Sequence, residues 1–288
     1  MTGCKYAYCT LLTSITIPDS VTEIGFGAFE NCTSLKDIYV NITDLAAYST
    51  KNKMHEIIRR NIRLLVNGVE ITELVIPNSV TEIGTSAFRD CTSLTSITIP
   101  DSVTSIGDSA FNGCTSLTCI TIPDSVTEIG TSAFRDCTSL TSITIPDSVT
   151  SIGKGAFYGC TSLTSITIPD SVTSIGDFAF NGCTSLTSIT IPDSVTSIGD
   201  YAFSGCTSLT SVTIPDSVTS IRYQAFYSCG NLREVYCKRT TPPSIVKGAF
   251  DFNLPGRDIY VPTASVDAYK SASGWSDYAS DIIGYDFE

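Results

Sequence analysis

Cysteine is the residue type whose spacing most strongly suggests chemistry in this sequence. Of the 12 cysteines, nine recur at one position of a 23-residue repeat: Cys9, Cys32, Cys91, Cys114, Cys137, Cys160, Cys183, Cys206 and Cys229. Stacked repeats would place neighbouring cysteines about 4.8 Å apart, close enough for disulfides. Parallel side chains point the same way, however, so we expect buried free thiols, with some disulfides as the alternative. With no C-x₂-C pair and one histidine, we expect no metal site and no cofactor.

Aspartate forms a second column, directly after the proline of each repeat. Its members are Asp19, Asp101, Asp124, Asp147, Asp170, Asp193 and Asp216. Carboxylates about 5 Å apart could hold Ca²⁺, because that ion prefers oxygen ligands. An Asx turn, in which each carboxylate accepts a backbone N–H, is the alternative. One repeat carries Asn78 instead, and asparagine can make the same turn without a charge, so we favour the turn.

Aromatic residues gather at the variable positions of the C-terminal repeats. They are Tyr158, Phe178, Tyr201, Tyr223 and Tyr227. An exposed aromatic strip is suited to contact with a partner, because such rings contribute much of the energy of interfaces. Solvated loop residues are the alternative. We treat the strip as a candidate binding surface.

Two further tyrosines replace threonine near the end of the array. Tyr236 follows Glu234 by two residues, and Tyr260 follows Asp258 in the same way. Tyrosine beside a carboxylate is better binding material than serine or threonine. Packing of the last coils beneath a cap is the alternative. Both tyrosines join the candidate binding surface.

Catalysis is not expected. An active site needs a nucleophile, a base and an orienting group held at one point. Residues 81–107 and 127–153 are identical, so the repeated surface offers no unique constellation. The single histidine, His55, lies among basic residues and is expected to face solvent. We predict a protein that is not an enzyme.

Composition limits the partners. The 288 residues are 42% hydrophobic and 16% charged, which favours a folded chain with a substantial core. The net charge of -12 argues against nucleic acid as a partner. No apolar run approaches the length of a transmembrane segment. The opening residues, MTGCKYAYCT, show no signal peptide and begin inside a repeat.

The elements that position these residues follow from the apolar pattern of one repeat. Leu94, Ile97 and Ile99 alternate with polar residues, which predicts a half-buried strand. Pro100 ends the strand because proline cannot donate a hydrogen bond to a sheet. A glycine marks a second turn, and the short segment through Phe111 is predicted as a 3₁₀ turn.

One such coil cannot bury its apolar face alone, so we predict a solenoid of stacked coils. The equivalent strand position is occupied by Ile15, Ile38, Leu74, Ile97, Ile120, Ile143, Ile166, Ile189, Val212, Val235 and Ile259. The prediction is therefore one parallel sheet of about eleven short strands. Stacked phenylalanines should form the spine of the core: Phe29, Phe88, Phe111, Phe134, Phe157, Phe180, Phe203 and Phe226.

The array divides into four segments of one continuous domain. Residues 1–42 hold the first two repeats, and residues 43–67 hold an inserted helical segment and the return to register. Residues 68–250 are the main array, and residues 251–288 hold the final strand and a C-terminal helical cap around Trp275. Thr43 and Ser265 are predicted to cap the helices of the insertion and of the C-terminal segment.

The pattern C-x₂-L-x₂-I-x-I-P-x₂-V-x₂-I-G-x₂-A-F-x₂ resembles the BspA-like, Treponema-type class of bacterial leucine-rich repeats, with 23 residues per repeat. The tail GWSDYASDIIGYDF is similar to the C-terminal ends of such proteins. The resemblance implies a leucine-rich-repeat solenoid, β-rich and without catalytic residues. It also implies an extracellular or cell-surface location, often with a role in adhesion.

These observations predict a non-catalytic interaction scaffold, acting as a surface or secreted adhesin-like module. Its partners would be host extracellular proteins, glycans or other bacterial surface proteins. The alternative is a structural protein that assembles end to end, because an unpaired first coil would be a template for another chain.

Overall fold

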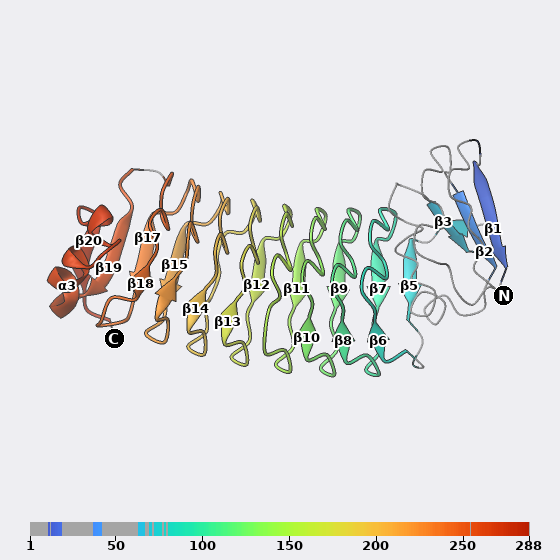
Figure 1. Ribbon diagram of the computed structural model, residues 1–288, viewed down its shortest axis with the longest axis horizontal. Coiled ribbons are helices and arrows are strands. Elements are labelled where there is room, and N and C mark those ends of the chain that lie inside the picture. The colour runs from blue at the N-terminus through green and yellow to red at the C-terminus, as the bar shows by residue number, and fades with distance from the viewer. Residues whose placement is uncertain are drawn as a thin grey trace.

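The computed structural model describes residues 11, 13–18, 37–41, 63–66, 69–70, 72–76, 78, 80–253 and 255–287. Short coils stack along one axis, and each coil adds a strand beside the strand of the coil before it (Figure 1). The fold is therefore a parallel β-solenoid, as predicted. No helix within these residues is long and apolar enough to cross a membrane.

The predicted strand forms the first of two ladders. Its members are β5 (Glu73–Val75), β7 (Ser96–Thr98), β9 (Cys119–Thr121), β11 (Ser142–Thr144), β12 (Ser165–Thr167), β15 (Ser211–Ile214), β17 (Glu234–Cys237), β19 (Asp258–Pro262) and β20 (Ile282–Tyr285). Strands β12 and β15 are joined through a bridge at Thr190. Equivalent residues face each other, as Ile143 faces Ile120 and Ile166. Ile143 is buried while Ser142 and Thr144 are exposed, which is the alternation that the sequence predicts.

A second ladder, which we did not predict, runs along an adjoining side of the coil. Its strands are β6 (Glu82–Ile83), β8 (Ser105–Ile106), β10 (Glu128–Ile129), β13 (Ser174–Ile175), β14 (Ser197–Ile198), β16 (Ser220–Ile221) and β18 (Ser244–Ile245). Each strand has only two residues, too few for an alternation to be recognised in the sequence. A glycine follows most of these strands, and in the central coils it permits a close approach, since a Cβ at Gly130 would lie 2.6 Å from the backbone nitrogen of Asp108.

The prediction of one sheet through eleven strands was wrong at the N-terminal end. Strands β1 (Ser14–Pro18), β2 (Asp37–Asn41), β3 (Arg63–Val66) and β4 (Val69–Glu70) form a separate four-stranded sheet. β3 pairs parallel to β2, and β4 then runs antiparallel to β3. The antiparallel turn interrupts the parallel progression, so β5 begins a new sheet. The predicted inserted helix and Thr43 lie outside the described residues.

The third side of the coil was predicted as a 3₁₀ turn, and its hydrogen bonds differ from that prediction. Ala133 and Arg135 donate within the coil to residues three positions earlier. The intervening residues Ser132 and Phe134 instead donate to the next coil, each over 2.8 Å. A continuous 3₁₀ helix would use every N–H inside the coil, so the coils would lose these lateral bonds. The segment is thus a chain of single turns.

Stacked phenylalanines form the core spine, as predicted. Ring centroids of consecutive coils lie 5.2–5.5 Å apart, with interplanar angles of 4–13°. This phenylalanine column consists of Phe88, Phe111, Phe134, Phe157, Phe180, Phe203, Phe226 and Phe250. Phe250 extends the predicted series through a repeat that is one residue longer. Phe29 lies outside the described residues.

The repeat cysteines lie beside this column as free thiols. Cys114, Cys137, Cys160, Cys183, Cys206 and Cys229 are each 0% exposed. Cys137 donates from Sγ to the carbonyl oxygen of Phe111 over 3.1 Å, and the other five make the equivalent bond. Each thiol therefore satisfies a carbonyl of the preceding coil. The prediction of buried free thiols is confirmed for these six residues. Cys91 is also a free thiol but is only partly buried, and Cys9 and Cys32 lie outside the described part of the chain.

The last coil is covered by a cap, as predicted. The cap contains η1 (Thr263–Ser265), α3 (Val266–Ser271) and η2 (Ser276–Tyr278), and Trp275 is fully buried in it. The indole Nε1 donates to the carbonyl oxygen of Pro243 over 2.8 Å. The cap was predicted as helical only, yet its last residues return as β20 beside β19. Ser265 makes no side-chain hydrogen bond at the start of α3, so that part of the prediction was wrong.

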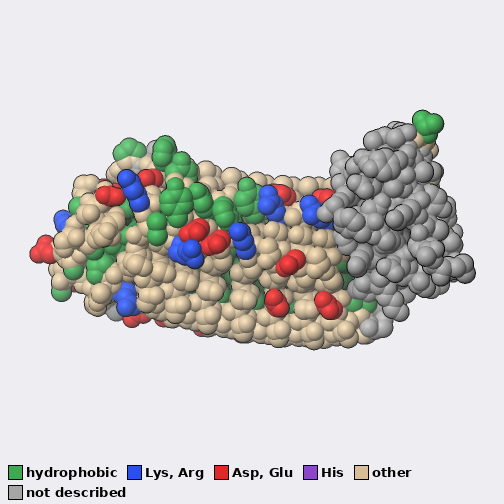
Figure 2. Space-filling view, in the orientation of Figure 1, with side chains coloured by type: hydrophobic (Ala, Val, Ile, Leu, Met, Phe, Trp, Pro, Cys, Tyr) green, Lys and Arg blue, Asp and Glu red, His purple; other side chains and the backbone are tan. Residues whose placement is uncertain are grey.

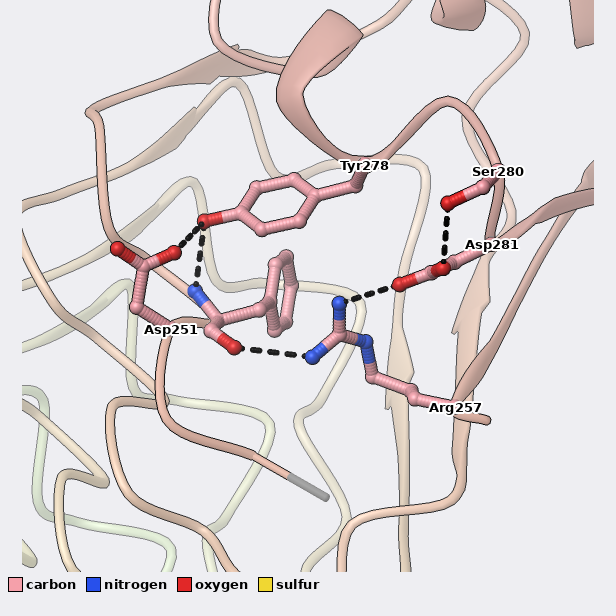
Figure 3. Close-up of polar contacts among 6 residues, drawn as sticks. Asp251, Arg257, Tyr278, Ser280 and Asp281 are labelled. Atoms are coloured by element: carbon pink, nitrogen blue, oxygen red, sulfur yellow. Dashed lines mark hydrogen bonds and ion pairs between the residues drawn. The ribbon is translucent and has the colours of Figure 1, made fainter. Parts of the chain in front are cut away.

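Arg257 joins the cap to the phenylalanine column (Figure 3). Its guanidinium donates to the carbonyl oxygen of Phe250 over 2.9 Å and to Asp281 Oδ2 over 2.7 Å. The hydroxyl of Tyr278 donates to Asp251 over 3.0 Å and accepts from the backbone N–H of Phe250 over 3.2 Å. The cap thus supplies partners for the backbone N–H and carbonyl oxygen of Phe250. The division of the chain at residues 42, 67 and 250 stays a prediction.

Candidate interaction surfaces

The loop side of each coil contains two positions with left-handed backbone. Serine or glycine occupies the first of them in most coils, as at Ser109 (φ 55°) and Ser132 (φ 55°). Phe178 (φ 58°) and Tyr201 (φ 55°) occupy the same position farther along the array. Bulky residues rarely adopt this conformation, because Cβ approaches the following carbonyl oxygen. The chain therefore holds two aromatic side chains where most coils carry serine or glycine.

These two residues begin a loop-side aromatic strip, which we define as Phe178, Tyr201, Tyr223, Tyr227 and Phe252. The rings of Phe178 and Tyr201 stack at 4.8 Å, and Tyr223 meets Tyr201 edge-on at 5.4 Å. Tyr227 contacts Phe252 at 5.0 Å, and Phe252 is 76% exposed. Figure 2 shows hydrophobic side chains gathered along this edge of the C-terminal half.

Charged groups beside the strip pair with one another or cover its rings. Asp200 forms an ion pair with Arg222 at 3.1 Å and also accepts from the backbone N–H of Tyr223. The ammonium of Lys154 lies 5.6 Å from the centroid of the Phe178 ring. Tyr158, which we also predicted to join the strip, is half-buried, and the guanidinium of Arg135 lies 4.3 Å from its ring centroid. The strip is thus mainly an apolar surface, with Asp200 held in an ion pair beside it.

The remaining predicted tyrosines lie on the outward face of the first ladder and belong to a different surface. Tyr236 and Tyr260 stack at 4.8 Å with an interplanar angle of 15°. Tyr285, from β20, meets both rings edge-on at 5.6 and 5.5 Å. We call Tyr236, Tyr260 and Tyr285 the sheet-face tyrosine cluster. The structure therefore divides the predicted binding residues between two surfaces.

Carboxylates fix the tyrosines of this cluster. The Tyr236 hydroxyl donates to Glu234 Oε2 over 3.1 Å, and the Tyr260 hydroxyl donates to Asp258 Oδ2 over 3.3 Å. Desolvation, followed by the bond to Glu234, raises the pKa of Tyr236 to about 12. Desolvation and Asp258 raise the pKa of Tyr260 as well. Both hydroxyls therefore stay protonated at neutral pH and continue to donate.

From β7 to β15 the outward face carries small hydroxyls and one exposed thiol, whereas β5 presents Glu73 and the exposed Val75. Ser142 and Thr144 are typical, and Cys119 takes the place of the serine in β9. Cys119 is exposed, as its position in the repeat predicts. This face repeats the same small groups from coil to coil, so it offers no local feature until it reaches Glu234 and Tyr236.

The aspartate column from Asp101 to Asp216 does not make the predicted Asx turns, and Asp19 lies outside the described residues. Asp124 is exposed, and no hydrogen bond to its carboxylate is present within the described part of the chain. Val126 donates its N–H to the carbonyl oxygen of Pro123 over 3.0 Å and closes the turn without the carboxylate. Ser125 Oγ then donates to Val103 of the preceding coil over 2.6 Å. Among the described residues, no group of histidine, cysteine and carboxylate side chains is arranged to hold a metal ion.

Three aromatic residues of these surfaces were missed in the sequence. Phe252 stands where most other coils carry glycine or aspartate at a left-handed position, and the longer last repeat hid that equivalence. Tyr285 and its neighbour Phe287, whose rings are 4.9 Å apart, were assigned to a helical cap. The alternating IIGYDF pattern was the signal that could have identified a final strand.

The repeat itself matches a known family. The model of the BspA type leucine rich repeat region matches residues 4–59, 65–186 and 150–270, with six copies. No curated protein matches the chain. Bacterial leucine-rich-repeat proteins of this kind are generally protein-interaction scaffolds and typically not enzymes.

Solved structures show the same fold. A leucine rich repeat protein of T. pallidum is 36% identical over 56% of this chain and 78% of its own, with a TM-score of 0.54. A leucine rich cell surface protein of Faecalibacterium prausnitzii is 29% identical over 95% of this chain and 83% of its own, with a TM-score of 0.56. A leucine-rich repeat protein of Bacteroides ovatus is 26% identical over 99% of this chain and 87% of its own, with a TM-score of 0.52. The chain belongs to the family of bacterial proteins built from BspA type leucine rich repeats.

Proposed function

We propose that this protein is an adhesin-like interaction module that works at or outside the cell surface. The observation that carries this proposal is the loop-side aromatic strip. Phe178 and Tyr201 adopt a left-handed backbone that costs about 1–2 kcal/mol per residue, yet their rings remain only partly buried. The folded chain gains little from such rings, so binding is the better reason for them.

The expected partners are host extracellular proteins, glycans or surface proteins of other bacteria. Exposed tyrosine and phenylalanine side chains supply large contact areas with few rotatable bonds, which suits recognition of several kinds of surface. The similarity to the cell surface protein of Faecalibacterium prausnitzii supports the location. The strip also fits an extended partner, because its members come from several successive coils.

Binding to a panel of matrix proteins, mucins and glycans at physiological salt tests the proposal. The test variant carries Phe178→Gly and Tyr201→Gly, because glycine keeps the left-handed backbone and removes the rings. The matched control carries Ser109→Gly and Ser132→Gly at the equivalent positions of earlier coils. We expect saturable binding that the test variant weakens at least about tenfold, while the control leaves it unchanged.

Three outcomes would contradict the proposal. Equal binding by the test variant and the wild-type chain would remove the strip from recognition. Absence of any binding, together with a mass that grows with concentration in light scattering, would favour end-to-end assembly instead. A chain that stays monomeric and binds nothing would also contradict an adhesin-like role.

A further inference from the structure

The sheet-face tyrosine cluster carries negative charge that no ion pair of the described residues neutralises. Ion pairs within the described residues join Arg89 to Asp90, Arg135 to Asp136, Arg222 to Asp200 and Arg257 to Asp281. None of them includes Glu234, Asp258 or Asp286. These three carboxylates accept hydrogen bonds only from hydroxyls, the third from Thr263 over 2.6 Å.

The nearby cationic side chains are directed elsewhere. Arg233 donates to the carbonyl oxygen of Pro255, and Arg239 donates to that of Asp216. Lys238 follows the strand and forms no ion pair with the cluster. The carboxylates of Glu234 and Asp258 therefore stand beside aromatic rings without a cation, on a chain whose net charge is -12.

We propose that the sheet-face tyrosine cluster docks an arginine side chain from a basic segment of a partner protein. A planar guanidinium stacks on tyrosine faces and donates to carboxylates in the same plane. Tyr285, which is 43% exposed, and the sides of Tyr236 and Tyr260 that do not stack on each other provide the aromatic surface, while Glu234 and Asp258 provide the acceptors. Charge complementarity selects a basic partner over a neutral or acidic one.

The cluster and the loop-side aromatic strip are independent surfaces. The strip belongs to the loops and has the Asp200–Arg222 ion pair beside it, whereas the cluster belongs to the outward face of β17, β19 and β20 and its carboxylates have no cation. The proposal therefore does not rest on the strip. A variant that loses binding at the strip and keeps binding at the cluster, or the reverse, distinguishes the two surfaces.

Peptide binding tests the proposal directly. The probe is a short fluorescent peptide that contains arginine, and its matched form carries citrulline, which has nearly the same shape and no charge. Fluorescence anisotropy with the full chain at physiological salt should show saturable binding of the arginine peptide. The citrulline peptide should bind at least about tenfold more weakly, because it keeps the planar group and loses the charge.

Variants locate the site. The combined change Glu234→Gln and Asp258→Asn should weaken the arginine peptide at least about tenfold, and Tyr236→Leu should weaken it as well. The control, Asp147→Asn with Asp170→Asn, removes the same charge from exposed turns and should leave binding unchanged. The strip variant Phe178→Gly with Tyr201→Gly should also retain peptide binding. Thermal unfolding of each variant shows that the fold is retained.

Three results would overturn the inference. The first is the absence of saturable binding by the arginine peptide. The second is equal affinity for the arginine and citrulline peptides. The third is equal weakening by the cluster variant and by the turn control, since that would reduce the effect to net charge.

Discussion

The phenylalanine column and the loop-side aromatic strip run along the same coils and use aromatic side chains in opposite ways. Column residues such as Phe157 and Phe180 are 0% exposed and stack almost parallel at 5.4 Å. Strip residues such as Phe178 and Tyr201 are partly exposed and need a left-handed backbone. Repeated aromatic positions in this chain therefore fill the core of the solenoid, whereas variable ones leave their rings accessible to solvent.

The largest change in the free energy of unfolding should come from alkaline pH, because several buried thiols beside the column respond to it together. Burial raises the pKa of Cys137, Cys183 and Cys229 from 9.0 to about 12. Between these values the unfolded chain loses the protons and the folded chain keeps them, so the free energy of unfolding falls as pH rises. The stabilisation that these protonated thiols contribute is therefore fully present below pH 9 and declines as the pH rises above 9.

At pH 10.5 we expect a loss of about 2 kcal/mol for each such thiol. Chemical denaturation at pH 8 and pH 10.5 measures the loss. The variant Cys137→Ala should show a smaller difference between the two pH values than the wild-type chain. Equal stability at both values would mean that the thiols are not held in a dry core.

The next largest effect is expected from the column itself. Phe157→Ala removes a ring that stacks on Phe134 and Phe180, and it leaves a cavity between coils. The free energy of unfolding should fall by about 3–5 kcal/mol in urea denaturation. A loss below about 1 kcal/mol would show that the column contributes little beyond the strands.

A somewhat smaller loss is expected where the column meets the cap. Arg257→Ala leaves Asp281 without its cation and the carbonyl of Phe250 without its donor. Because the arginine side chain is only 6% exposed, we expect a loss of about 3 kcal/mol by denaturation. The control Arg135→Ala removes an exposed pair with Asp136 and the contact of its guanidinium with the Tyr158 ring, and should cost at most about 2 kcal/mol. Similar losses from both would contradict a structural role for the cap contact.

The smallest effect is expected in the strip. Phe178→Gly relieves about 1–2 kcal/mol of backbone strain and loses about 0.5–1.5 kcal/mol of stacking on Tyr201. The net change in the free energy of unfolding should stay within about 1 kcal/mol, and Ser132→Gly is the control without a ring. Destabilisation comparable to Phe157→Ala would erase the distinction between strip and column.

Most of the fold could be predicted because the same apolar pattern recurs in each repeat. The recurrence of Ile143 and its equivalents predicts the first ladder, and the recurrence of Phe134 and its equivalents predicts the core. The second ladder was not predicted because a strand of two residues, such as Ser105–Ile106, is too short to show an alternation of polar and apolar side chains. The separate N-terminal sheet was not predicted because it depends on the antiparallel pairing of Val66 with Val69. That pairing is not part of the repeat pattern.

The candidate surfaces were only partly predictable. Variable aromatic residues such as Tyr201 stand out against identical repeats, so the strip was visible in the sequence. The left-handed backbone of Phe178 was not visible, since it follows from lateral hydrogen bonding between coils. The separation of Tyr236 from the strip required the register of the first ladder, and the place of Tyr285 required the pairing of β20 with β19.

Hydroxyl-radical footprinting of the chain bound to a panel partner tests the central claim most directly. Oxidation of Tyr201, Tyr223 and Phe252 is measured with and without the partner, and buried Phe157 serves as an internal reference. We predict that binding lowers oxidation of these strip residues several-fold and leaves the repeated coils of residues 91–153 unchanged. Protection of those repeated coils, with full oxidation of the strip, would contradict the account.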